Sequence, residues 1–94
     1  MNKFSGKASY YGHEAGKRTA SGQRYNPYGL TAAHRTLPFG TKLRVTHNGR
    51  SVVVVVNDSG PFIKSRVLDL SLGAAKAIGL IQKGVGHITA EIIN

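Results

Sequence analysis

Residues 52–62 read VVVVVNDSGPF, a run of five valines that stops abruptly at NDSGP. β-Branched residues favour strands. Because the run does not alternate with polar residues, we expect both faces of the strand at 52–56 to be covered, as in a closed barrel. Gly and Pro then force the chain to turn. The stretch therefore predicts a buried strand with Asp58 at its end.

A hairpin leads into this strand. TKLRVT (41–46) and the valine run flank Asn48-Gly49, and Asn-Gly is the strongest two-residue signal for a hairpin turn. Residues 41–46 alternate, so we expect the two apolar side chains to face inward and Lys42 and Arg44 to face solvent. The two segments together predict an antiparallel pair on one wall of the barrel.

The remaining apolar runs are short and are separated by twelve glycines and three prolines, as in a small all-β domain. We expect further strands within Ser5–Gly12, Gly29–His34, Ser65–Ser71 and Gly86–Ile93, a surface loop over Gly12–Tyr28 and a turn at Leu37–Gly40. The one predicted helix lies in SLGAAKAIGL (71–80), with Ser71 as its N-cap, Leu72, Ala75 and Ile78 on one face and Gly79 at its end.

Length and composition limit the possible classes. Residues 1–94 are expected to form one small domain, and the absence of cysteine excludes disulfides and thiolate zinc sites. No apolar run reaches the ~18–20 residues that a membrane-spanning helix needs. The start MNKFSGKAS lacks the apolar stretch of a signal peptide. We therefore expect a mature domain whose Met1 was added and whose leader is not part of this sequence.

The chain is strongly basic, with thirteen Lys and Arg against four acids and a formal net charge of +9. Such a surface attracts polyanions, including nucleic acid and acidic wall polymers, or is simply a solvated basic face. The sequence contains no recognised RNA-binding motif and no helix suited to the DNA major groove. Any nucleic-acid binding is therefore expected to be weak and sequence-indifferent.

Four carboxylates are available for acid–base chemistry: Glu14, Asp58, Asp69 and Glu91. We expect Glu14 to be solvated in the long loop, Glu91 to point to solvent from the last strand, and Asp69 to lie near the N-terminus of the helix, where a negative charge is favourable. Asp58 has two possible roles. A carboxyl at a rigid strand end can be partly desolvated and carry a proton at neutral pH, or it can accept backbone N–H bonds and only shape the loop.

His34 ends the small-residue run LTAAH and is either a hydrogen-bonded structural residue or a catalytic one. None of the other three histidines has metal-ligand spacing to a partner, so no metal site is predicted. No P-loop, dinucleotide-binding glycine pattern or nucleophile elbow is present. We therefore expect no cofactor.

Six stretches in order resemble the motifs of the RlpA (rare lipoprotein A) family. They cover about residues 6–93, and the pairing of TAAHRTLPFGT with VVNDSGPF is very specific to that family. The full set is GKASYYG (6–12), RTASGQRYN (18–26), LTAAHRTLPFGTKLRVT (30–46), NGRSVVVVVNDSGPF (48–62), RVLDLSLGAAKAIG (66–79) and GHITAEII (86–93).

The resemblance implies a six-stranded double-psi β-barrel with one short helix, related in fold to expansins. It also implies a lytic transglycosylase that cuts peptidoglycan glycan strands, preferring strands without stem peptides. Asp58 in NDSGPF would be the catalytic acid and His34 in AAHRTLP its companion, with a hydrogen bond between the two side chains when His34 is neutral. The expected substrate contacts are Gln23, Arg35, Tyr11 and Tyr25.

This chain departs from the usual family pattern at Gln23, where relatives often read SGERY, and at Ser59, where they often read NDRGPF. It also has Tyr10-Tyr11 where Trp-Tyr is usual. Gln23 and Ser59 favour an alternative, a non-catalytic expansin-like module that binds or loosens the wall. In either case we expect a periplasmic, outer-membrane-associated or secreted monomer whose partner is the peptidoglycan glycan strand.

Overall fold

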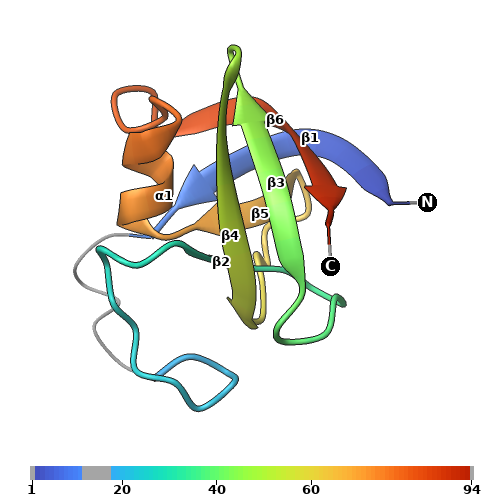
Figure 1. Cartoon of the computed structure of the whole chain (residues 1–94), viewed down its shortest axis with the longest axis vertical. Coiled ribbons are helices and arrows are strands. Elements are labelled where there is room, and N and C mark those ends of the chain that lie inside the picture. The colour runs from blue at the N-terminus through green and yellow to red at the C-terminus, as the bar shows by residue number, and fades with distance from the viewer. Residues whose placement is uncertain (1, 12–17, 94) are drawn as a thin grey trace.

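The hairpin around Asn48-Gly49 forms one wall of a closed barrel in the computed structural model, which describes residues 2–11 and 18–93 (Figure 1). Its arms are β3 (Lys42–His47) and β4 (Arg50–Asp58), paired in antiparallel register. The φ angles of Asn48 and Gly49 are 49° and 78°, and two adjacent positive values are what a type I′ turn requires. The predicted hairpin is confirmed.

Four more strands complete the barrel in the spatial order β1-β5-β2-β4-β3-β6, and β6 pairs with β1 to close it. Two neighbouring pairs, β1–β5 and β2–β4, are parallel, and the others are antiparallel. The predicted class, a six-stranded all-β barrel with one short helix, is confirmed. The added strands are β1 (Lys3–Tyr10), β2 (Thr31–Ala33), β5 (Arg66–Leu70) and β6 (Val85–Ile92).

The core fills the inside of the barrel. Leu43 and Val45 face inward as expected, but the valine run is not covered on both faces. Val54 and Val56 are fully buried, whereas Val53 is 40% exposed on the outer surface. The expectation was wrong because the barrel buries only its inner face. The fully buried apolar residues include Ala8, Ala32, Leu43, Val45, Val54, Val56, Leu68, Leu70, Leu80 and Ile88.

Helix α1 (Leu72–Ala77) follows β5 and packs beside the barrel wall (Figure 1). Ser71 caps it as predicted, because its Oγ accepts from the Ala74 N–H. The same hydroxyl donates to the carbonyl of Gly29 (2.6 Å) and accepts from the N–H of Thr31 (3.2 Å). Ser71 therefore ties the helix start to the segment entering β2.

Asp69 does not serve the helix N-terminus as expected. Its Oδ1 accepts from the Ser9 hydroxyl on β1 at 2.6 Å, and the Arg66 guanidinium lies 4.0 Å from the same oxygen. The parallel register places Asp69 opposite Ser9, which explains the pairing. This carboxylate therefore links β1 to β5 rather than stabilising α1.

The sequence placed several element boundaries only approximately. β1 begins two residues before the predicted Ser5, because Lys3 and Phe4 pair with the end of β6. β2 is only three residues long, since the bonding with β5 stops at Ala33. Residues 12–17 of the predicted surface loop, Glu14 among them, lie outside the described residues. Over the described ranges, no helix has the length and apolar character to cross a membrane.

Candidate functional site

Asp58 and His34 lie at the same end of the barrel because β2 and β4 are parallel. Ala33, the last residue of β2, pairs with Asp58, the last residue of β4. The backbone N–H of His34 donates to the carbonyl of Asp58 at 3.1 Å. Two residues 24 positions apart in the sequence are thus fixed beside each other by a backbone hydrogen bond.

The Asp58 carboxylate is half-buried and held through one of its oxygens. Oδ1 accepts from the N–H of the following residue, Ser59 (2.9 Å), and from the N–H of Ala20 (2.8 Å), 38 residues earlier in the chain. The first contact is a local one of the loop-shaping kind, and the second crosses from another segment. Within the described residues no hydrogen bond reaches Oδ2. One oxygen therefore orients the group and leaves the other for a ligand.

The segment that supplies Ala20 packs on the end of β4. The N–H of Ser21 donates to the carbonyl of Asn57 (3.2 Å), and the Asn57 amide donates to Gln23 Oε1 (3.0 Å). Asn57 is buried, while Gln23 is exposed. Gln23, a predicted substrate contact, therefore sits next to the residue that precedes Asp58, and within the described residues its amide N–H₂ makes no hydrogen bond.

The His34 ring is oriented by its own turn. Its Nδ1 accepts from the backbone N–H groups of Thr36 and Leu37, both at 3.1 Å, so the proton of the neutral ring is assigned to Nε2. Burial lowers the pKa of His34 below its usual value, and the positive charge of Arg35 adds to this. Phe4 packs edge-on against the ring, with centroids 5.2 Å apart. These contacts favour a neutral imidazole.

The hydrogen bond predicted between the side chains of His34 and Asp58 does not occur in the described residues. Two backbone donors occupy His34 Nδ1, and two others occupy Asp58 Oδ1. The two residues are joined instead through the His34 N–H and the Asp58 carbonyl.

Arg35 and Tyr25, both predicted to contact the substrate, make hydrogen bonds to the backbone of the protein itself. One Arg35 nitrogen, Nη2, donates to the carbonyls of Ile63 (2.7 Å) and Arg66 (2.6 Å). Tyr25 is only 5% exposed, and its hydroxyl donates to the Tyr11 carbonyl (3.0 Å). Arg35 thus links two loops, and Tyr25 supports the end of β1.

Tyr11 is the other predicted contact and is partly buried against Tyr25, with ring centroids 4.8 Å apart. Burial raises the pKa of the Tyr11 phenol, and the charges of nearby groups, that of Asp58 first among them, add to this; the adjacent Thr31 hydroxyl acts in the opposite direction. The Tyr11 hydroxyl is thus a neutral group within electrostatic range of Asp58.

A hollow of about 250 Å³ opens beside His34 and Ser59, the residue that follows Asp58; Asp58 itself is not among its lining residues. We call it the rim hollow; it is lined by His34, Arg35, Thr36, Leu37, Pro38, Phe39 and Ser59. The sequence prediction did not include Phe39, nor Phe62 in the GPF turn, although both are exposed aromatic residues close in sequence to the predicted pair. It also missed the Ala20 N–H, because a backbone donor leaves no mark in the sequence.

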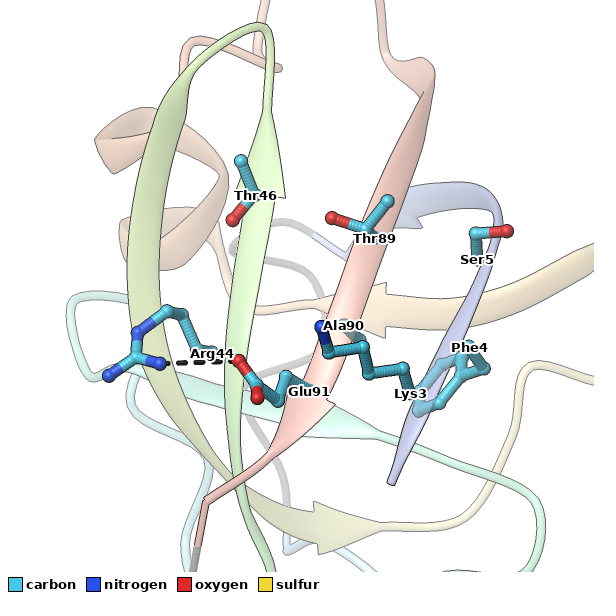
Figure 2. A pocket seen from close by; sticks show the side chains of 8 residues that line it. All are labelled: Lys3, Phe4, Ser5, Arg44, Thr46, Thr89, Ala90 and Glu91. Carbon is cyan, nitrogen blue, oxygen red and sulfur yellow. Dashed lines mark hydrogen bonds and ion pairs between the residues drawn. The ribbon is translucent and has the colours of Figure 1, made fainter. Parts of the chain in front are cut away.

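A larger hollow of about 410 Å³ lies on the outer face of β1, β3 and β6 (Figure 2). We call it the sheet hollow; none of the predicted site residues lines it. Arg44 and Glu91 form an exposed ion pair across it at 3.3 Å, in agreement with the outward positions expected for both. Its lining is Lys3, Phe4, Ser5, Arg44, Thr46, Thr89, Ala90 and Glu91.

No cluster of three or more His, Asp or Glu side chains in the described part of the chain is arranged to hold a metal ion. The rim hollow itself is lined by the His34 imidazole and the Phe39 ring. Close to it in the chain or through backbone bonds are the Asp58 carboxylate, fixed by two backbone donors, and the exposed Gln23 amide. This set suits proton transfer to and from a neutral, polar ligand.

Comparison with known proteins places these features in a family. A family model described as "Lytic transglycolase" matches residues 3–90. A probable endolytic peptidoglycan transglycosylase RlpA of Nostoc sp. is 55% identical over 96% of this chain, and an endolytic peptidoglycan transglycosylase RlpA of Pasteurella multocida is 52% identical over 94% of it. The chain spans only 26% and 31% of those two proteins.

Solved structures share the barrel. The Streptomyces papain inhibitor superposes with a TM-score of 0.81 at 25% identity, covering 98% of this chain and 94% of its own. An expansin of Clavibacter michiganensis has a TM-score of 0.79 at 24% identity and covers 98% of this chain, which matches half of the expansin. At that identity the expansin likeness concerns the fold alone, the double-psi β-barrel.

Proposed function

Since this chain belongs to the RlpA family of lytic transglycosylases, we propose that its barrel cleaves the glycan strands of bacterial peptidoglycan and leaves 1,6-anhydro-muramic ends. The observation that carries the proposal is the setting of Asp58. Its carboxylate is held through Oδ1 by the N–H groups of Ala20 and Ser59, and Ser59 lines the rim hollow together with His34. Such a group is pre-positioned to exchange a proton with a bound sugar.

The proposed reaction needs one acid. Protonated Asp58 donates its proton to the glycosidic oxygen while the bond from that oxygen to C1 of the muramic residue breaks. The C6 hydroxyl of the same residue then attacks C1 and gives its proton to the Asp58 carboxylate. The new C1–O6 bond closes the anhydro ring, and no water is consumed. Because the nucleophile is part of the substrate, its effective concentration is high.

The distribution of carboxylates supports a mechanism with one acid. Hydrolysis by the usual route takes two carboxyl groups ~5–9.5 Å apart. Among the acids in the described residues, Asp69 and Glu91 are both within 4 Å of an arginine nitrogen, whereas Asp58 has no such partner. Asp58 is therefore the acid that we assign to the reaction.

Neighbouring groups would orient the substrate. Neutral His34 carries its proton on Nε2 and can donate it to a sugar or acetamido oxygen. Gln23 accepts from Asn57 through Oε1, which leaves its N–H₂ for a similar contact. Strands without stem peptides carry a free carboxylate on each muramic lactyl group, which a chain of net charge +9 attracts. A wall substrate implies an extracytoplasmic site of action, and we propose that the 94-residue chain acts as one monomeric domain.

The direct test is to incubate the chain with purified peptide-free glycan strands and measure anhydromuramic ends by mass spectrometry. The wild type should release them, and the Asp58→Asn variant should not. Equal release from both proteins would remove Asp58 from the mechanism. Wild type that binds the strands but releases no anhydromuramic ends would favour the expansin-like alternative, which Gln23 and Ser59 also favour.

A further inference from the structure

Phe62 is the most exposed of the large apolar side chains in the described part of the chain, at 87%, although it lies only four residues after Asp58. Phe39 is 49% exposed and lies five residues after His34 in the sequence. Neither ring is needed to fill the barrel core, which consists of aliphatic residues. An exposed aromatic ring that no core packing requires is free to contact a ligand.

Both rings are carried by the loops that form the site. Phe39 lines the rim hollow together with His34 and Ser59. Phe62 folds back along the turn that follows Asp58: a Cβ placed on Gly60 would be 3.7 Å from the Phe62 ring. Phe62 therefore belongs to the same turn as Ser59, which lines the hollow, although Phe62 itself is not among the lining residues.

Arg35 connects the two loops. It lies directly after His34, and its Nη2 donates to the carbonyls of Ile63 and Arg66, on either side of the exposed 64–65 turn that follows Phe62. Charge-assisted bonds at 2.7 and 2.6 Å are short and directional. The position of the Phe62 loop relative to the His34 turn is thus fixed by one guanidinium.

We infer that Phe39 and Phe62 are the stacking residues of the glycan site and that Arg35 is a positioning residue, which acts by holding the Phe62 loop in place. The ligand class is a polymer of pyranose rings, whose C–H faces pack on aromatic rings while their hydroxyl and acetamido groups face Asp58 and His34. The inference rests on the proposed function for the identity of the polymer. It replaces the direct substrate contact predicted for Arg35.

Binding measured without turnover tests the stacking residues. In the Asp58→Asn chain, which keeps the strands intact, we expect Phe39→Ala and Phe62→Ala each to weaken binding of peptide-free glycan strands by about threefold to tenfold in isothermal titration. Phe62→Trp should retain or improve the affinity. Val53→Ala is the matched control, because it removes an exposed apolar side chain on the outer face of β4. Unchanged binding by Phe62→Ala, or an equal loss in Val53→Ala, would overturn the inference.

A double-mutant cycle tests the role of Arg35. Arg35→Lys keeps the charge but cannot reproduce the directed contact to both carbonyls. We expect Arg35→Lys to weaken strand binding about as much as Phe62→Ala, and to add less than twofold when Phe62 is already alanine. Fully additive losses would show that Arg35 contacts the strand itself and would overturn its positioning role. Thermal unfolding of each variant identifies any that is not folded, and Arg35→Gln then provides a second arm of the cycle.

The two proposals can fail separately. Wild-type chain that binds strands through Phe62 but forms no anhydromuramic ends would contradict the proposed reaction and support the stacking site. A variant that keeps Asp58 and forms those ends with Phe39 and Phe62 both replaced by alanine, at undiminished affinity, would contradict the stacking site and leave the reaction intact.

Discussion

The sheet hollow and the rim hollow differ in size, construction and chemistry. The sheet hollow is the larger, about 410 against 250 Å³, and regular strands form it. The rim hollow is formed by the segment after β2 together with Ser59 after β4. The residues that line the rim hollow follow two different strands and meet where those strands end. The comparison shows that volume alone does not identify a reaction site in this fold.

The carboxylates near the two hollows also have different partners. In the sheet hollow Glu91 is neutralised by Arg44, and both side chains are well exposed, at 41% and 50%. At the rim, Asp58 is fixed by neutral backbone donors and is not paired with a cation in the described residues. Asp58 is thus oriented by backbone dipoles and Glu91 by an opposite charge.

The largest expected effect concerns Asp58. Asparagine keeps an oxygen that can accept from Ala20 and Ser59, so Asp58→Asn should retain the fold, but it cannot donate a proton to the glycosidic oxygen. We expect release of anhydromuramic ends to fall about 10²–10⁴-fold, the usual contribution of a general acid. Glu91→Gln is the matched control on the sheet hollow. A comparable loss in that variant would erase the distinction between the two hollows.

His34 tests how far the rim is preorganised. His34→Ala leaves the N–H groups of Thr36 and Leu37 without their acceptor, and we expect a loss of about 1–3 kcal/mol in the free energy of unfolding by urea. His34→Asn offers an amide oxygen at a similar position and should recover much of the stability but not the activity. If alanine were as stable as the wild type, the turn would not depend on the ring.

The sequence predicted the parts of this comparison unequally. The hairpin and the Ser71 cap follow from local signals: Asn-Gly, and a hydroxyl before an apolar face. The closed barrel agrees with the resemblance, but the reason given for the valine run was wrong, because only one face of that strand is buried. The residues singled out Asp58 and His34 with two roles open for each, the resemblance implied a catalytic role for both, and their proximity follows from parallel pairing of β2 and β4. The roles of Arg35 and Asp69 could not be predicted, because both depend on partners distant in sequence, Ile63 for the first and Ser9 for the second.

The stability that His34 contributes at the rim hollow should depend on pH. The pKa of His34 is lowered in the folded state by burial and by Arg35, so the unfolded chain binds more protons near this pKa. The contribution of His34 to stability is therefore complete above its unfolded pKa of ~6.5 and is lost as the pH falls through the lower folded value. Urea unfolding of the wild type and of His34→Asn should be compared from about pH 7.5 to about pH 4.5, a range that brackets the unfolded pKa. We expect the wild type to have the larger free energy of unfolding at the higher pH, and the difference to shrink on acidification. An advantage that grows instead would mean that the folded protein favours the imidazolium.

The smallest effect is expected in the sheet hollow. Arg44 and Glu91 are opposite each other on β3 and β6 and exposed to solvent, so their ion pair should contribute only about 0.2–1 kcal/mol to the free energy of unfolding. We expect Arg44→Gln and Glu91→Gln to have little effect on anhydromuramic release, and the coupling between them in a double-mutant cycle to disappear in about 1 M salt, where screening is nearly complete. Strand binding that falls tenfold in either variant while Phe62→Ala binds normally would move the glycan site from the rim to the sheet face. A small, salt-sensitive coupling would instead show that the charges of Arg44 and Glu91 are solvated. In a chain of net charge +9, most cations then contribute to the overall electrostatic potential rather than contact a particular ligand.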